Sequence, residues 1–143
     1  MTPLEVVRLE LHATLVEQLG AAGLPADAIH AYAPDELATP TAWIVSPFGI
    51  RPSDPRTVVA EVSVIVVVDG AEPAQLAALD DLTAAAWVAL ELVGTATLAG
   101  ATVLAAGGPT LHAVTVAGDV DVDVRTLCPP VLELAELPKS RSR

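Results

Sequence analysis

Three aspartates occupy alternate positions in the segment GDVDVDV, at residues 119, 121 and 123. On a β-strand, Asp119, Asp121 and Asp123 would point to one face, and the valines between them would point to the other. Neighbouring carboxylates would lie roughly 7 Å apart, where two charges repel by about 0.6 kcal/mol in water and about 2.4 kcal/mol at an effective dielectric near 20. The repulsion within this aspartate row is therefore small where the row faces water or a cation, and large where it faces a dry core.

Three interpretations of this aspartate row are open: a solvated sheet face, an acidic surface toward a partner or a channel, and a metal site. A helix–loop–helix calcium loop counted from Asp119 needs glycine where Val124 stands and glutamate where Pro130 stands. A strand also spreads the three carboxylates over about 13 Å, too far for one cation to bind all of them. The pattern therefore favours the first two interpretations.

The other residues with chemical potential are scattered. His12, His30 and His112 lie on separate predicted elements, and no spacing of the HExxH type occurs. Cys128 is the single cysteine, which excludes a disulfide within the chain, and a Cys128–His112 dyad stays an alternative to a packed thiol. The segment GGPT lacks the lysine of a phosphate loop. We therefore expect no catalytic residues, no metal, no cofactor and no enzyme.

Two arginines stand out because bases are rare. Arg51 and Arg56 are the only basic residues between Arg8 and Arg125, in a segment (46–57) that contains three prolines and is predicted to be a loop. One interpretation is an ordinary connection between strands. The other is a contact in which these arginines meet acidic residues of a neighbouring subunit.

Charge and composition exclude nucleic-acid binding and indicate one domain. The 143 residues carry a net charge of −11, and aromatic residues make up 3% of the chain. Phosphate contacts need clustered lysine and arginine, and base stacking needs aromatic rings. Residues 1–137 hold all 18 acidic residues and four basic ones, whereas the end of the chain, PKSRSR, adds three bases. We predict a single domain over residues 1–137 and a short basic tail over residues 138–143.

The chain is unusually apolar for a soluble monomer, with a mean hydropathy of +0.56. Residues 82–111 contain one charge, Glu91, and are long enough to span a bilayer, but glycines and Pro109 interrupt them. The composition therefore favours apolar surface buried against partners over a membrane segment.

The order of elements predicts an α+β fold, with a mainly antiparallel mixed sheet packed with two helices. Thr2-Pro3-Leu4-Glu5 is a capping box that begins a helix with an apolar stripe, and Gly20 and Gly23 end it. A second helix begins at Pro73 and ends near Val93, with a buried stripe predicted at Leu76, Leu79, Thr83, Ala86, Leu90 and Val93. Strands are predicted within 27–34 and over 41–48, 58–69, 95–106 and 110–127, and the strand 58–69 is expected to lie centrally.

The run VSVIVVVDGAEPAQLAALDDLTAAAWVALE (62–91), the capped N-terminal helix and the closing VDVRTLC together resemble the tail terminator proteins of long-tailed, siphovirus-type bacteriophages, particularly those of actinobacterial hosts. That resemblance implies a structural virion protein that forms a hexameric ring at the head-proximal end of the tail tube. The ring would end tube polymerisation and join the tail to the neck, without chemistry or cofactor.

The same resemblance implies the partners: further copies of the chain, the major tail tube protein, and a neck or head–tail connector protein. DNA would pass through the lumen, no membrane would be involved, and assembly would occur in the host cytoplasm. Two alternatives stay open, a neck or head–tail connector protein of the same virion and a small ligand-binding α+β domain.

A ring gives the singled-out charges a role. Asp119, Asp121 and Asp123 become candidates to face the lumen or the neighbouring subunit, where an acidic wall would repel DNA phosphates. Arg51 and Arg56 become candidate inter-subunit contacts.

Overall fold

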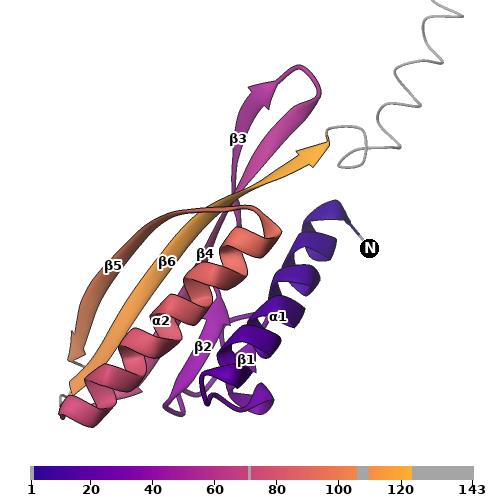
Figure 1. Ribbon diagram of the computed structural model, residues 1–143. Coiled ribbons are helices and arrows are strands. Elements are labelled where there is room, and N and C mark those ends of the chain that lie inside the picture. The colour runs from indigo at the N-terminus through magenta and orange to yellow at the C-terminus, as the bar shows by residue number, and fades with distance from the viewer. Residues whose placement is uncertain (1, 71, 106–109, 124–143) are drawn as a thin grey trace, which may run out of the picture.

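The computed structural model describes residues 2–70, 72–105 and 110–123 of the chain (Figure 1). Two long helices and one six-stranded sheet make up the fold, which confirms the predicted α+β class. The elements in chain order are α1 (Pro3–Ala21), the 3-10 helix η1 (Ala26–Ala28), β1 (Ile29–His30), β2 (Thr41–Ile44), β3 (Gly49–Asp54), β4 (Thr57–Asp69), α2 (Pro73–Val93), β5 (Thr95–Ala105) and β6 (Thr110–Asp123). Neither helix has the length and apolar character to cross a membrane, as judged over the described residues.

The sheet is organised around β4. The strand order is β1-β2-β4-β6-β5, and every pair is antiparallel except β1 with β2. One edge of β4 pairs with β2 near its end and with β3 near its start, while the other edge pairs with β6 along its whole length. Strand β3 and the start of β4 extend beyond the helices, and the last residues of β6 pair with this part of β4 (Figure 1). We call this projection the β-arm: Gly49–Asp54, residues 57–61 and residues 119–123.

Helix α1 begins where the capping box predicts. The Thr2 hydroxyl accepts a hydrogen bond from the Glu5 backbone N–H at 3.2 Å, and Pro3 occupies the first turn, where its missing N–H costs nothing. Gly23 then adopts a φ of +105°, which allows the chain to turn back after the helix.

The core lies between the two helices and one face of the sheet, which we call the inner face. Alternate valines of β4 and β6 point inward, and the stripes of both helices pack on them. Its largest fully buried members are Leu11, Leu15, Leu19, Leu24, Ile44, Leu90, Val62, Val64, Val66, Val68 and Val116. Because these side chains are almost all Val, Leu and Ala, the core has the aliphatic character that the composition requires.

The predicted stripe of α2 is partly wrong. Leu79, Ala86 and Leu90 are buried as expected, but Leu76 is 37% exposed. Leu82 and Ala89, which the prediction left out, are buried. A hollow of about 340 Å³ separates the start of α2 from β5 and β6, so Leu76 is less buried than a continuous stripe implies.

The prediction of a loop over residues 46–57 is also wrong, because Gly49–Asp54 forms β3 and pairs with β4. Proline is tolerated here since β3 is an edge strand, and the register shifts between Pro52 and Asp54. The strand predicted over 41–48 is shorter than expected, and the one within 27–34 has two residues. The predicted turn near residue 107 and the end of the last strand beyond residue 123 lie outside the described residues.

Gly94 is the point where the chain passes from α2 to β5 directly over β6. Its N–H closes the helix by donating to the Leu90 carbonyl at 2.7 Å. A Cβ placed on Gly94 would overlap the main-chain oxygen of Asp119, and one placed on Gly118 would lie 2.8 Å from the Thr95 oxygen. The two backbones therefore approach so closely that neither position has room for a side chain.

We predict that Gly94→Ala lowers the free energy of unfolding by about 1–3 kcal/mol, because the added methyl group forces the α2–β5 connection away from β6. Urea denaturation followed by circular dichroism measures this. Gly100→Ala is the matched control, since nothing lies within 4 Å of a Cβ at that position of β5. We expect it to change stability by less than about 0.5 kcal/mol. Equal effects of the two substitutions would contradict the steric explanation.

Candidate functional site

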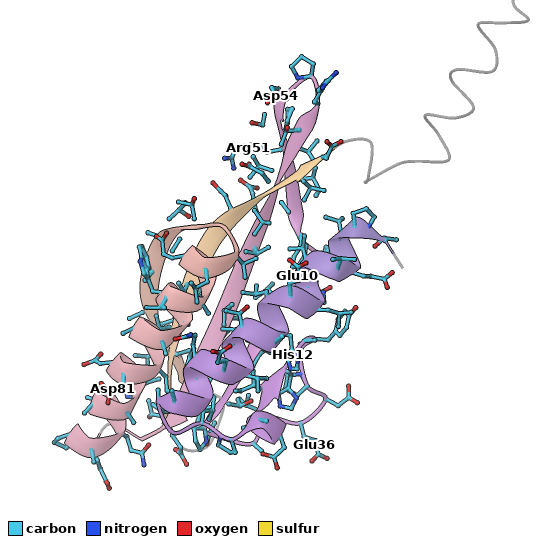
Figure 2. The ribbon with its side chains drawn as sticks, turned by 45° about the vertical axis from the view of Figure 1, so that its right-hand side comes forward. Glu10, His12, Glu36, Arg51, Asp54 and Asp81 are labelled. Carbon is cyan, nitrogen blue, oxygen red and sulfur yellow. The ribbon has the colours of Figure 1, made fainter. Side chains whose placement is uncertain are left out.

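The β-arm carries an ion-paired cluster on the face of the sheet opposite the helices, which we call the outer face. Glu61 of β4 and Asp119 of β6 are direct partners in the antiparallel register. Arg51 of β3 reaches both: its Nη1 lies 2.8 Å from Glu61 Oε2, and its Nη2 lies 3.0 Å from Asp119 Oδ2. The cluster therefore joins all three strands of the β-arm through one guanidinium (Figure 2 labels Arg51).

The electrostatics explain why Arg51 sits there. Two carboxylates directly opposite one another on neighbouring strands repel, and a cation between them removes that repulsion. Hydrogen bonds to Asp119, and then to Glu61, raise the pKa of Arg51 above its ordinary value. The side chains are 47%, 51% and 27% exposed for Arg51, Glu61 and Asp119, so water screens the attraction. The ion pairs therefore add little to the stability of the fold, and main-chain pairing holds the three strands together.

The aspartate row follows the predicted alternation over the described part of β6. Asp119, Asp121 and Asp123 lie on the outer face, while Val120 and Val122 are 7% and 5% exposed in the core. Asp121 and Asp123 are exposed, whereas Asp119 is half-buried against Arg51. Whether this row faces a lumen or a neighbouring subunit stays a prediction.

The two predicted contact arginines occupy different environments. Arg51 is bonded within its own chain, as described above. Arg56 follows β3 at the end of the β-arm, where its backbone N–H donates to Asp54 Oδ1 at 2.8 Å and its side chain is exposed (Figure 2 labels Asp54). A contact of either arginine with another subunit stays a prediction. Of the two side chains, that of Arg56 is more accessible to a neighbour than that of Arg51.

Among the described residues, no group of three or more histidine, cysteine, aspartate or glutamate side chains could hold a metal ion. His12 Nε2 lies 3.0 Å from the Ile29 carbonyl oxygen, which ties α1 to the short strand β1. His112 Nε2 is buried without a hydrogen-bond partner in a hollow of about 340 Å³ between the start of α2 and the strands β5 and β6. Cys128 lies outside the described residues, so the Cys128–His112 alternative is untested.

A buried cation that sequence reasoning missed lies on α1. Arg8 is 5% exposed, and its guanidinium donates to the carbonyls of Ala31 at 2.7 Å and of Ile44 and Val45 at 3.4 Å each. It also lies between two aromatic rings, with its Cζ 4.5 Å from the centre of Tyr32 and 4.3 Å from that of Phe48. Burial lowers the pKa of Arg8, and the nearby Tyr32 opposes that shift.

Arg8 therefore fastens the first half of α1 to the segments on either side of β2. A guanidinium satisfies several carbonyls at once because its donors form a planar fork, and it stacks on aromatic faces. In the sequence, Arg8 is only a single basic residue next to Val7 of the buried stripe. Its burial cannot be predicted from that position, because its hydrogen-bond partners are main-chain oxygens that no residue pattern reveals.

Strand β5 forms an exposed edge of the sheet. It contains 11 residues without a charge, and its outer edge pairs with no strand within the described ranges. Leu98 is 65% exposed and Val103 is 58% exposed. The neighbouring outer face is lined by small or apolar side chains, with Trp43, Ile65, Thr115 and Gly100 in one row across β2, β4, β6 and β5.

The elements form a single-domain α+β protein. No protein-family model matches the chain, and no curated protein matches it. The chain is similar to a chain of a solved structure described as "Virion of native gene transfer agent (GTA) particle". The similarity covers 78% of this chain and 93% of that chain, with 20% identity and a TM-score of 0.49. At this level the likeness assigns no function.

We predict that Arg8→Met lowers the free energy of unfolding by about 1–3 kcal/mol, because buried carbonyls lose their donor while the aliphatic volume is kept. Chemical denaturation monitored by tryptophan fluorescence measures this. Arg56→Met is the matched control, since it removes the same charge from an exposed position, and it should change stability by less than about 0.5 kcal/mol. If both substitutions cost the same, the buried hydrogen bonds of Arg8 are not the reason.

Proposed function

We propose that this chain is a non-catalytic structural protein of a phage-like virion, and specifically a tail terminator. In this proposal six copies close into a ring on the head-proximal end of the tail tube. The ring ends tube polymerisation and offers its other side to a neck or head–tail connector protein. The proposal joins the resemblance in the sequence to the contact surfaces of the fold.

The observation that carries the proposal is the exposed edge of β5. Proteins usually guard a long edge strand with charges, proline or a covering element, because its open N–H and C=O groups pair readily with other chains. Over its 11 residues β5 has neither a charge nor a proline, and two of its large apolar side chains are mostly exposed. A closed ring of heterologous contacts covers such an edge in every copy, and it stops growth at a fixed number of subunits.

The charges of the outer face fit a lumen through which DNA passes. Glu61, Asp119 and Asp121 lie on this face, with Arg51 as the basic side chain among them. Non-specific DNA affinity comes from neutralising phosphates, so an acidic wall lets the duplex move without sticking. We propose that the outer face lines the lumen and that the helices face outward.

The mass of the assembled protein tests whether the chain forms a ring. Light scattering over a concentration series measures this mass, and negative-stain images of the same fractions show the shape. A ring has a mass of about 88 kDa, six times 14.6 kDa. We predict that Leu98→Lys, which places a charge on β5, shifts the protein toward the monomer. Leu92→Lys on α2 is the matched control, because Leu92 is 64% exposed and Leu98 is 65% exposed.

Purified tail tubes separate the proposal from its alternatives. A terminator caps one end of a tube directly, whereas a neck connector binds only tubes that are already capped. A protein that stays monomeric and ignores tube ends contradicts both roles. A melting temperature that shifts with a small molecule would then favour a ligand-binding domain.

A second prediction concerns Arg56. Because Arg51 is already paired inside the chain, Arg56 is the exposed basic side chain left for a neighbour in the described part of the chain. We expect Arg56→Gln to weaken assembly by up to about fivefold per interface, the value of an exposed ion pair. The loss should disappear at high salt. Gln75→Glu changes the net charge by the same amount at an exposed position on α2, and it should leave assembly unchanged. Equal assembly of the two variants at low salt would contradict the contact.

A further inference from the structure

A groove of about 490 Å³ opens at the base of the β-arm, between the start of α1, the end of α2 and the last residues of β6. Its floor is aliphatic: Val7, Val120 and Val122 are buried to 5–8% exposure, and Val6 at the edge is 39% exposed. The groove opens to water above these valines and its lining is mostly apolar, so apolar side chains that entered it would be removed from water.

The rim of the groove is acidic. Glu10, Asp121 and Asp123 are exposed along it, and none of its lining residues within the described ranges is basic. Figure 2 shows Glu10 on α1, below the β-arm. A segment that fits this groove therefore needs apolar side chains for the floor and basic side chains for the rim.

The chain itself contains such a segment, directly after the groove. Residues 124–143 lie outside the described residues, and their sequence includes VLELAEL (131–137) followed by PKSRSR (138–143). Residues 1–123 hold 16 acidic and three basic residues, whereas residues 124–143 hold two acidic and four basic ones. The two parts of the chain therefore carry net charges of opposite sign.

The connection is short enough to return to the groove. Asp123 is the last described residue and lines the groove, and Val131 follows eight residues later. Eight extended residues reach about 26 Å, so Val131 can lie anywhere within that distance of Asp123. Pro129 and Pro130 cannot continue a strand ladder, which favours a change of direction before the leucines. Attachment beside the groove also gives the segment a high effective concentration there.

We propose that residues 131–143 bind in this groove of their own chain, with Val131, Leu132, Leu134 and Leu137 against the valine floor and the basic end along the acidic rim. The groove is thus an internal docking site for the C-terminal segment. This inference does not depend on the proposed function, because it needs one copy of the chain.

Disulfide trapping in the full chain tests the inference. In a Cys128→Ser background, Val6→Cys is combined in turn with Leu132→Cys, Leu134→Cys and Leu137→Cys, and the pairs are oxidised at low protein concentration. A disulfide forms only where the Cα atoms come within about 7 Å of each other. We expect at least one pair to form an intrachain disulfide at least tenfold faster than the same tail position paired with Leu9→Cys. Leu9 is the matched anchor, since it is 47% exposed on the same helix, close to the point where the tail is attached, and does not line the groove.

Equal rates for the Val6 and Leu9 anchors would overturn the inference. Disulfides formed only between chains would overturn it as well, because they assign the groove to a second copy. A denaturing gel separates intrachain from interchain products whether or not a ring forms, so neither result bears on the tail-terminator proposal.

A second measurement keeps the native cysteine and all groove residues. Replacing Leu132, Leu134 and Leu137 together by glutamate should raise the hydrogen-exchange rates of backbone amides around Val6 and Val7 at least threefold. Unchanged exchange at those amides would contradict docking even if the cysteine variants failed to fold.

Discussion

The ladder between β4 and β6 is the constraint on which the rest of the structure depends. Thirteen consecutive residue pairs, from Thr57 with Asp123 to Asp69 with Leu111, hold the two strands in a single register. Because side chains alternate strictly along a strand, this register decides at once which residues enter the core and which face outward. A slip of one residue would move the inward valines to the outer face and bring the aspartate row into the core.

The same register brings two carboxylates together and positions the arginine that pairs with both. It sets Glu61 opposite Asp119, two carboxylates that repel, on the face of the sheet opposite the helices. Strand β3 adds a third strand at this point and brings Arg51 between them. The β-arm is thus held by main-chain pairing and a shared cation, with little apolar burial on its outer face.

Most of the fold could be predicted from the sequence because its signals are local. The capping box, the alternation of β4 and the Pro73–Gly94 bounds of α2 each depend on a few consecutive residues, and all are confirmed. The segment of β3 was predicted wrongly as a loop because its prolines signal a break in any strand, whereas an edge strand tolerates them. The candidate site was predictable only in part: the alternation of Asp119, Asp121 and Asp123 is local, but the pairing of Asp119 with Arg51 joins residues 68 positions apart.

The sequence by itself determined the elements, the aliphatic core and the face on which the aspartates lie, since periodicity and capping act between near neighbours. Only the tertiary structure decided that Arg51 is bonded within its chain, that Arg8 is buried among carbonyls and rings, and that β5 has an open edge. These features depend on the strand order and on hydrogen bonds to main-chain groups. Because every residue carries the same main-chain groups, the order of side chains in the sequence does not reveal which carbonyl or N–H group a distant side chain or strand will bind.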